Sequence, residues 1–504
     1  MEKKKGLLNV SVAVVFRFLL LIATLFVRRC LIRYIGNEVN GLDSLYTSLI
    51  GFLSVAELGV GTAITFCMYK PIVENDIEKV SALYQLFTKI YRVISAVMLL
   101  IGVALIPLLP FLAKDYADFD VNLGVTFFLM LLSVVISYVF AAKTSLINAY
   151  KNNYVTTAIS SLGMLLQCGA QIVVVILTQS FAAYLACRIG AMLLQLAATE
   201  LYARRHHKEI LKHRKETVDA ETKKQIVNNV KAMFMHRLGA SLVNSTDSMI
   251  ISAMIGVVLL GKYSNYSTIA AAMVSVLTLA FSSLTSIVGH AYVEDREETE
   301  QYFRKFYALN YALGVVFFLG YYAVIDDMVT ILFGGTLLLS KSVSANVTAN
   351  YFVQFMRQSA LLFRDATGTF YNDRWKPLFE GVCNVVLSIS FVKLFAYIGG
   401  EELGVVGVIA ATIVTNLFIC HVVEPYVLYK HAFQKPVKKH MLRNYCYMAV
   451  FTAALLAMSF FMQTLENAWL ELFVNGLISL VISAITLSVV FLAEKGLRRS
   501  LKAR

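Results

Sequence analysis

The stretch VAVVFRFLLLIATLFVRRCLIRYIGNEVNG, residues 12–41, decides the fold class, because it contains an apolar helix of membrane-spanning length with arginine inside it. Arg17 lies about ten residues into the apolar segment that begins near Leu7. A guanidinium at that depth costs several kcal/mol, so it should face protein or water rather than lipid. Arg28 follows three helical turns later and shares its face. The stretch therefore predicts a membrane helix with a cationic stripe directed at an internal space.

The composition extends this prediction to the whole chain. Of 504 residues, 58% are hydrophobic and 15% are charged, whereas a soluble protein has about 25% charged residues. We therefore expect an all-α polytopic membrane protein. Its seven cysteines are scattered and form no CxxC or Cys/His ligand pattern. Neither a metal site nor a cofactor is predicted.

Apolar runs of spanning length predict about 14 transmembrane helices, near 7–32, 43–68, 84–112, 122–149, 154–177, 181–203, 233–256, 262–290, 304–325, 347–371, 376–397, 404–429, 443–463 and 468–493. Of the 45 lysines and arginines, 34 fall on the side of the two termini, 7 on the other side and 4 within spans. The positive-inside rule then predicts a multi-pass cell (cytoplasmic) membrane protein with both termini in the cytoplasm. This asymmetry explains most of the net charge of +13 without nucleic acid.

An internal repeat divides the chain. Phe16 and Arg17 match His236 and Arg237 at an offset of 220 residues, and the glycine pattern that follows repeats at the same offset (Gly36 and Gly41, Gly256 and Gly261). Because the offset spans six helices, the halves share one orientation, as two lobes related by a pseudo-two-fold along the membrane normal. We expect an N-lobe at 1–203, a basic cytoplasmic linker at 204–232, a C-lobe at 233–430, and two further helices with the tail at 431–504.

Charged residues inside the spans indicate a central cavity. The proposed cations are Arg17, Arg28, Arg237 and Arg357, and the acids Glu57 and Asp247 are predicted to couple an ion or to pair with them. A cavity with this positive balance favours an anion, and the planar fork of arginine suits phosphate or pyrophosphate. Further polar lining is predicted from Asn244, Gln354 and Arg364.

Each of these residues also has a structural interpretation. Arg17 could pair with Glu57 or Asp247, and Arg28 and Arg237 could reach towards the membrane surface. Glu57 could instead fix a helix–helix contact. The chain contains no Walker A sequence, no metal-ligand spacing and no large outer loop. An enzyme is therefore not expected.

Several segments resemble polysaccharide (Wzx-type) flippases of the multidrug/oligosaccharidyl-lipid/polysaccharide (MOP) exporter superfamily. They are Arg17 to Arg28, IGNEVNGLDSLY (35–46), AELGVGTAI (56–64), MYKP (68–71), NAYKNNY (148–154) and its second-half counterpart FYNDRWKP (370–377). Arg17 and Arg28 match the first-helix arginines of that family, whereas Arg237 and Arg357 extend the pattern through the repeat and the spacing.

The resemblance implies an alternating-access transporter that moves an undecaprenyl-pyrophosphate-linked oligosaccharide, the polysaccharide repeat unit, driven by a H⁺ or Na⁺ gradient. Its implied partners are membrane lipids and the glycan polymerase or glycosyltransferases, and it would act as a monomer. Two alternatives remain open from the residues. One is a cation-coupled multidrug or metabolite exporter of the same superfamily, and the other is a non-transporting membrane subunit of a glycan-assembly complex.

Overall fold

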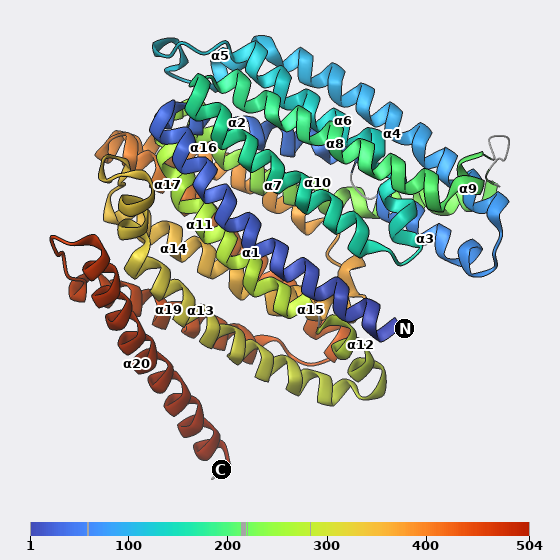
Figure 1. Cartoon of the computed structure of the whole chain (residues 1–504). Coiled ribbons are helices and arrows are strands. Elements are labelled where there is room, and N and C mark those ends of the chain that lie inside the picture. Colours follow the sequence, from blue (N-terminus) through green and yellow to red (C-terminus); the bar gives the residue numbers. More distant parts are fainter. Residues whose placement is uncertain (1, 58–59, 213–217, 219, 283, 503–504) are drawn as a thin grey trace. The chain divides into compact units, whose positions relative to one another are not determined.

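The computed structural model describes residues 2–57, 60–212, 218, 220–282 and 284–502, which are almost entirely helical and contain no β-strand (Figure 1). The helices of the first half are α1 (Glu2–Tyr34), α2 (Asn37–Leu53), η1 (Ser54–Glu57), α3 (Val60–Val73), α4 (Ile77–Leu105), η2 (Ile106–Leu108), α5 (Leu109–Leu112), η3 (Tyr116–Asp118), α6 (Leu123–Ala149), α7 (Asn153–Thr178), α8 (Phe181–His206), α9 (Lys208–Lys212) and α10 (Ala220–Met254).

The helices of the second half are α11 (Val257–Ser282), α12 (Thr285–Glu294), α13 (Arg296–Phe333), η4 (Gly335–Leu337), α14 (Lys341–Met356), α15 (Gln358–Ala366), η5 (Thr369–Tyr371), α16 (Lys376–Gly399), α17 (Glu401–Thr415), η6 (Asn416–Cys420), α18 (His421–Leu428), η7 (Tyr429–Phe433), α19 (Lys438–Phe461) and α20 (Ala468–Lys502). The segments η6 and η7 are π-helical, a form that is rare and concentrated at functional sites.

The predicted all-α membrane architecture is confirmed. Within the described ranges, nine helical segments are long and apolar enough to cross a membrane. The remaining helices follow the predicted apolar runs in order. The count of fourteen spans stays a prediction.

The chain forms two compact units, Met1–Gly261 and Lys262–Arg504. The first unit therefore includes α10, which the sequence repeat assigns to the second lobe. The predicted boundaries at 203, 232 and 430 stay predictions. In the first unit α6 packs between α4 and α8 (Figure 1). Tyr46 of α2 is fully buried there, and its hydroxyl lies 2.9 Å from the Thr126 hydroxyl of α6.

The internal repeat is visible in the helix ends. Helix α1 ends at Tyr34 and α10 ends at Met254, an offset of 220 residues. Each is followed by a glycine with positive φ, Gly36 at 138° and Gly256 at 147°, a region that other residues rarely adopt. The amide of Gly36 donates to the carbonyl of Leu31, and that of Gly256 to the carbonyl of Ile251. The two helix ends thus share the same local geometry, as the predicted repeat requires.

The next glycine pair lets the starts of α2 and α11 touch backbone to backbone. A Cβ atom on Gly41 would lie 1.9 Å from the Val257 carbonyl oxygen, and one on Gly261 would lie 2.4 Å from the Asn37 carbonyl oxygen. The Asn37 side-chain amide donates to the Val258 carbonyl across this crossing. Residues 37 and 41 thus contact 257 and 261 reciprocally, the pattern expected of ends related by a local two-fold.

The second unit has an aromatic core between α13, α14 and α19. Phe352 and Phe451 are stacked with their ring centroids 3.5 Å apart, and Tyr311 stacks on Tyr447 at 4.0 Å. The buried Tyr307 hydroxyl donates to the side-chain oxygen of Asn444. Rigid rings of this size fill the space between these helices.

Candidate substrate pocket and buried charge networks

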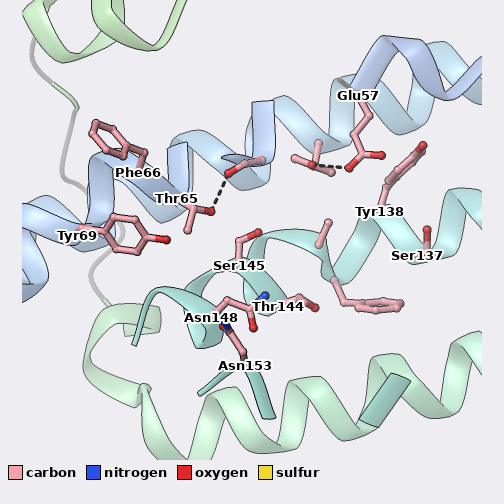
Figure 2. A pocket seen from close by; sticks show the side chains of 14 residues that line it. Glu57, Thr65, Phe66, Tyr69, Ser137, Tyr138, Thr144, Ser145, Asn148 and Asn153 are labelled. Carbon is pink, nitrogen blue, oxygen red and sulfur yellow. Dashed lines mark hydrogen bonds between the residues drawn. The ribbon is translucent and has the colours of Figure 1, made fainter. Parts of the chain in front are cut away.

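The first unit contains a cavity of about 710 Å³ between α3, α4, α6 and α7 (Figure 2). Ligand pockets of small molecules commonly have volumes of roughly 300–1,000 Å³. Its lining is rich in hydroxyl, amide and aromatic groups: Glu57, Gly61, Thr65, Phe66, Tyr69, Tyr91, Ser137, Tyr138, Phe140, Ala141, Thr144, Ser145, Asn148 and Asn153. Among these residues Glu57 carries the single formal charge.

Two tyrosines position Glu57 at one end of this pocket. Glu57 is the last residue of the short 3₁₀ turn between α2 and α3. The Tyr91 hydroxyl donates to its carboxylate at 2.8 Å, and the Tyr138 hydroxyl interacts with it as well. Gly61 leaves room for this arrangement, because a Cβ there would lie 3.0 Å from the Tyr91 hydroxyl. The carboxylate is held by neutral donors, so its charge is not cancelled by these contacts.

The opposite end of the pocket combines polar groups with aromatic faces. Figure 2 shows Ser145, Asn148 and Asn153 on the side facing Phe66 and Tyr69. The two residues are 60% and 49% exposed, so their rings are accessible. Hydroxyl and amide groups that both donate and accept, beside an aromatic face, suit a neutral polyhydroxylated or amide-bearing ligand. This lining was not predicted, apart from Glu57.

Arg28 lies in a second polar cluster of the same unit. It is half-buried and interacts electrostatically with Asp43 of α2 and Tyr184 of α8. Arg188 donates to both oxygens of Asp43, at 2.9 and 3.1 Å. Two arginines and one carboxylate leave one net positive charge. The structure thus brings Arg28 together with a second arginine, Arg188, which was not among the predicted cavity residues.

Arg357, the predicted cavity cation of the second half, lies in a buried ion network. It follows the last residue of α14 and donates to Glu424 at 2.6 and 3.3 Å, to Glu380 at 3.3 Å and to the Asn416 side chain at 2.6 Å. The Glu424 side chain is 1% exposed and that of Glu380 is 5% exposed. Asn416 is the first residue of the π-helical segment η6, so this segment supplies a hydrogen-bond acceptor for the guanidinium.

Lys376 completes this network. Its ammonium lies 2.6 Å from Glu424 and 2.8 Å from Glu380. Two cations and two carboxylates balance, so Arg357 does not contribute the uncompensated charge on which its prediction was based. The two glutamates and the lysine were missed. The spacing of Lys376 and Glu380, four residues apart in an apolar run, was the available signal.

The second-tier residues have local partners. The Gln354 amide donates to Asn350 at 3.1 Å. Arg364 binds Asp365 at 2.9 Å and Asp373 at 3.1 Å, near the end of α15. Asp247 is half-buried in α10. Arg17, Arg237 and Asn244 lie in helices α1 and α10, but their side chains fall outside the part of the chain that the structure describes. Their predicted roles stay predictions.

Known structures share this fold over most of its length. A lipid II flippase, MurJ, in an inward closed conformation matches 95% of this chain and 98% of its own, with a TM-score of 0.63 and 14% identity. An inward-facing multidrug resistance MATE family transporter of the MOP superfamily matches 80% of this chain and 95% of its own, with a TM-score of 0.58 and 15% identity. A Vibrio cholerae MATE transporter, a mutant of VcmN, matches 85% of this chain and 100% of its own, with a TM-score of 0.51 and 15% identity.

No protein-family model matches the sequence. No curated protein sequence matches it significantly either. At 14 and 15% identity the structural matches define the architecture rather than the activity. The chain therefore has the fold of the MOP exporter superfamily, as the sequence resemblance predicted.

Proposed function

We propose that this protein is an alternating-access flippase that moves an undecaprenyl-pyrophosphate-linked oligosaccharide across the cytoplasmic membrane. The observation that carries the proposal is the extent of the structural match. The lipid II flippase aligns with 95% of the chain, whereas the two MATE transporters align with 80% and 85%. Part of the chain that the MATE transporters do not match therefore has a counterpart in the lipid II flippase.

Two features of the first unit support this substrate class. The cluster of Arg28, Arg188 and Asp43 has one net positive charge and two guanidinium groups, which suit a pyrophosphate. The pocket beside Glu57 provides hydroxyls, amides and open aromatic faces, which suit sugar rings. We assign Arg17 and Arg237 to the same cationic path on the basis of the repeat. Arg357 is left out of it, because Glu380 and Glu424 balance its charge and that of Lys376.

Glu57 is the proposed coupling group, and Asp247 is a second candidate for the same role. A carboxylate that two tyrosine hydroxyls hold inside a membrane-embedded pocket can take up and release a proton or a sodium ion. The proposal includes the cytoplasmic location of both termini, a monomeric state, and contact with the glycosyltransferases and polymerase that make and consume the substrate.

The sidedness of the accumulated intermediate tests this function. Cells depleted of the protein should accumulate the lipid-linked oligosaccharide in the inner leaflet, beyond the reach of a lectin added to intact spheroplasts. Export should return with the wild-type chain and fail with Arg17→Ala at a normal membrane level. Intermediate accumulating in the outer leaflet would contradict a flippase, because it would place the block after translocation.

A cation-coupled multidrug or metabolite exporter is the second candidate, and the Glu57 pocket itself favours it. A carboxylate near aromatic faces also suits an organic cation. This candidate predicts drug protection in cells that lack other pumps, and normal glycan display without the protein. A non-transporting subunit of a glycan-assembly complex predicts instead that charge reversal at Arg17 and Glu57 leaves glycan display intact.

A further inference from the structure

A second large cavity lies in the other unit, outside the pocket and networks described above. It has a volume of about 770 Å³ and lies between α13, the segment before α19, α19 itself and α20. Its lining has a charged part, formed by Glu300, Arg304, Lys305, Lys435 and Arg443 beside the neutral Gln301, and an apolar part, formed by Ala308, Leu309, Ala312 and Phe491. Four cations face one carboxylate, a formal excess of three positive charges.

Buried Glu300 holds the charged part in place. Its side chain is 2% exposed, accepts from Arg304 through both oxygens, and lies 3.7 Å from the ammonium of Lys435. Arg443 donates through Nε to the Tyr447 hydroxyl at 2.9 Å and through Nη1 to the Arg304 carbonyl at 3.4 Å. Fixed donors of this kind bind an anion with a small loss of side-chain entropy.

The remaining charges leave the excess largely intact. Glu297 lies 3.8 Å from Lys435 and is 82% exposed, so water screens it. Lys305 is exposed and its ammonium lies 5.7 Å from the Tyr302 ring centre. Including Glu297, the surroundings still carry two net positive charges.

The apolar part continues from the cations along the same face of α13. Ala308, Leu309 and Ala312 follow Arg304 and Lys305 at helical spacing, and Phe491 of α20 faces them. Leu309 is 52% exposed and Phe491 is 46% exposed. A cationic end that passes into an open apolar wall matches a molecule with an anionic head and a hydrocarbon tail.

We propose that this cavity binds the anionic, phosphate-bearing headgroup of a lipid with net negative charge, with the start of its hydrocarbon chain against Leu309 and Phe491. The positive-inside rule assigns the loops beside Arg304 and Lys435 to the cytoplasm, so the lipid belongs to the inner leaflet. Both a bulk anionic phospholipid and a polyprenyl pyrophosphate have this chemistry. The inference requires only a membrane protein and stands apart from the transport proposal.

Binding to the purified full-length chain tests the site, with phosphatidylglycerol, phosphatidylcholine, undecaprenyl pyrophosphate and soluble pyrophosphate as probes. The double variant Lys305→Gln/Arg443→Gln should lose roughly 30-fold in affinity for phosphatidylglycerol, since each cation near an anionic lipid contributes about fivefold. The matched control Lys430→Gln/Lys439→Gln removes two charges from the same region and should bind normally. An equal loss in both double variants would overturn the site.

A separate substitution tests the apolar part of the cavity. Leu309→Asn should weaken the binding of both anionic lipids, phosphatidylglycerol and undecaprenyl pyrophosphate, severalfold and leave the binding of soluble pyrophosphate unaffected. Phosphatidylglycerol binding as tightly as undecaprenyl pyrophosphate assigns the site to bulk lipid, and a clear preference for the latter assigns it to the transported class. Tight binding of phosphatidylcholine, or soluble pyrophosphate binding as tightly as both lipids, would refute the proposal.

Discussion

Replacement of Glu424 by glutamine is expected to destabilise the second unit strongly. The Glu424 side chain is 1% exposed and accepts from Arg357 and from Lys376, each at 2.6 Å. Glutamine keeps the shape but removes the charge, so two buried cations would then share Glu380 alone. Breaking a buried ion pair by removal of one partner costs about 3–5 kcal/mol. Since folded proteins are stable by about 5–15 kcal/mol, that loss is a large fraction of the total.

A double-mutant cycle measures this network. The free energy of unfolding in detergent micelles is compared for Glu424→Gln, for Lys376→Met and for the double variant. Each single change leaves one buried charge uncompensated, whereas the double variant leaves the neutral pair of Arg357 and Glu380. We therefore expect the double variant to be more stable than the sum of the single losses predicts, by about 1–3 kcal/mol. Glu466→Gln, at an exposed carboxylate, should change stability by less than about 0.5 kcal/mol.

The result that would refute this reasoning is additivity. If the two single losses simply add, or if each is below about 1 kcal/mol, the carboxylate and the ammonium are not compensating each other. Arg357 would then have charge to offer a substrate, and its predicted role in the cavity would gain support.

Three further changes test the first unit. Gly41→Ala should lower the thermal midpoint of unfolding, because its Cβ would overlap the Val257 carbonyl oxygen and overpacking costs about 1–3 kcal/mol. Gly169→Ala is the control: no atom lies within 4 Å of its Cβ, so the midpoint should not change. Glu57→Gln should fold normally, because glutamine can still accept a hydrogen bond from the Tyr91 hydroxyl. Transport by this variant in reconstituted vesicles should no longer depend on an ion gradient. If the dependence is retained, Glu57 is not the coupling group. Arg28→Gln should weaken substrate binding, measured by titration, about 10- to 150-fold, which corresponds to the loss of one charge-assisted hydrogen bond. Unchanged affinity would show that Arg28 has a structural role only.

The parts of the fold that depend on local chemistry were predictable. The repeat of Gly36 and Gly41 by Gly256 and Gly261 could be found from the sequence alone. The structure shows Gly36 and Gly256 with similar positive φ, and Gly41 and Gly261 each close to the backbone of the other segment. Helical spacing and hydropathy depend on near neighbours in the chain, which is why the apolar runs and the all-α architecture followed from them.

The partners of the charged residues were not predictable, because they are distant in the chain. Asp43 and Arg188 are 145 residues apart, and Arg357 and Glu424 are 67 apart. Helical periodicity tells which face of a helix a charge occupies, but not which helix packs against that face. The cavity was therefore predicted from a list of charges that omitted the carboxylates neutralising Arg357.

Translocation by the purified protein tests the central claim most directly. Vesicles that contain the full chain and a fluorescent undecaprenyl-pyrophosphate-linked oligosaccharide are placed under a proton or sodium gradient, and the labelled glycan that becomes accessible to an external lectin is measured over time. We expect lectin access to rise well above that of protein-free vesicles, and uptake of a cationic dye to remain at the background level. No translocation under any gradient, or transport of the dye alone, would contradict the proposed flippase.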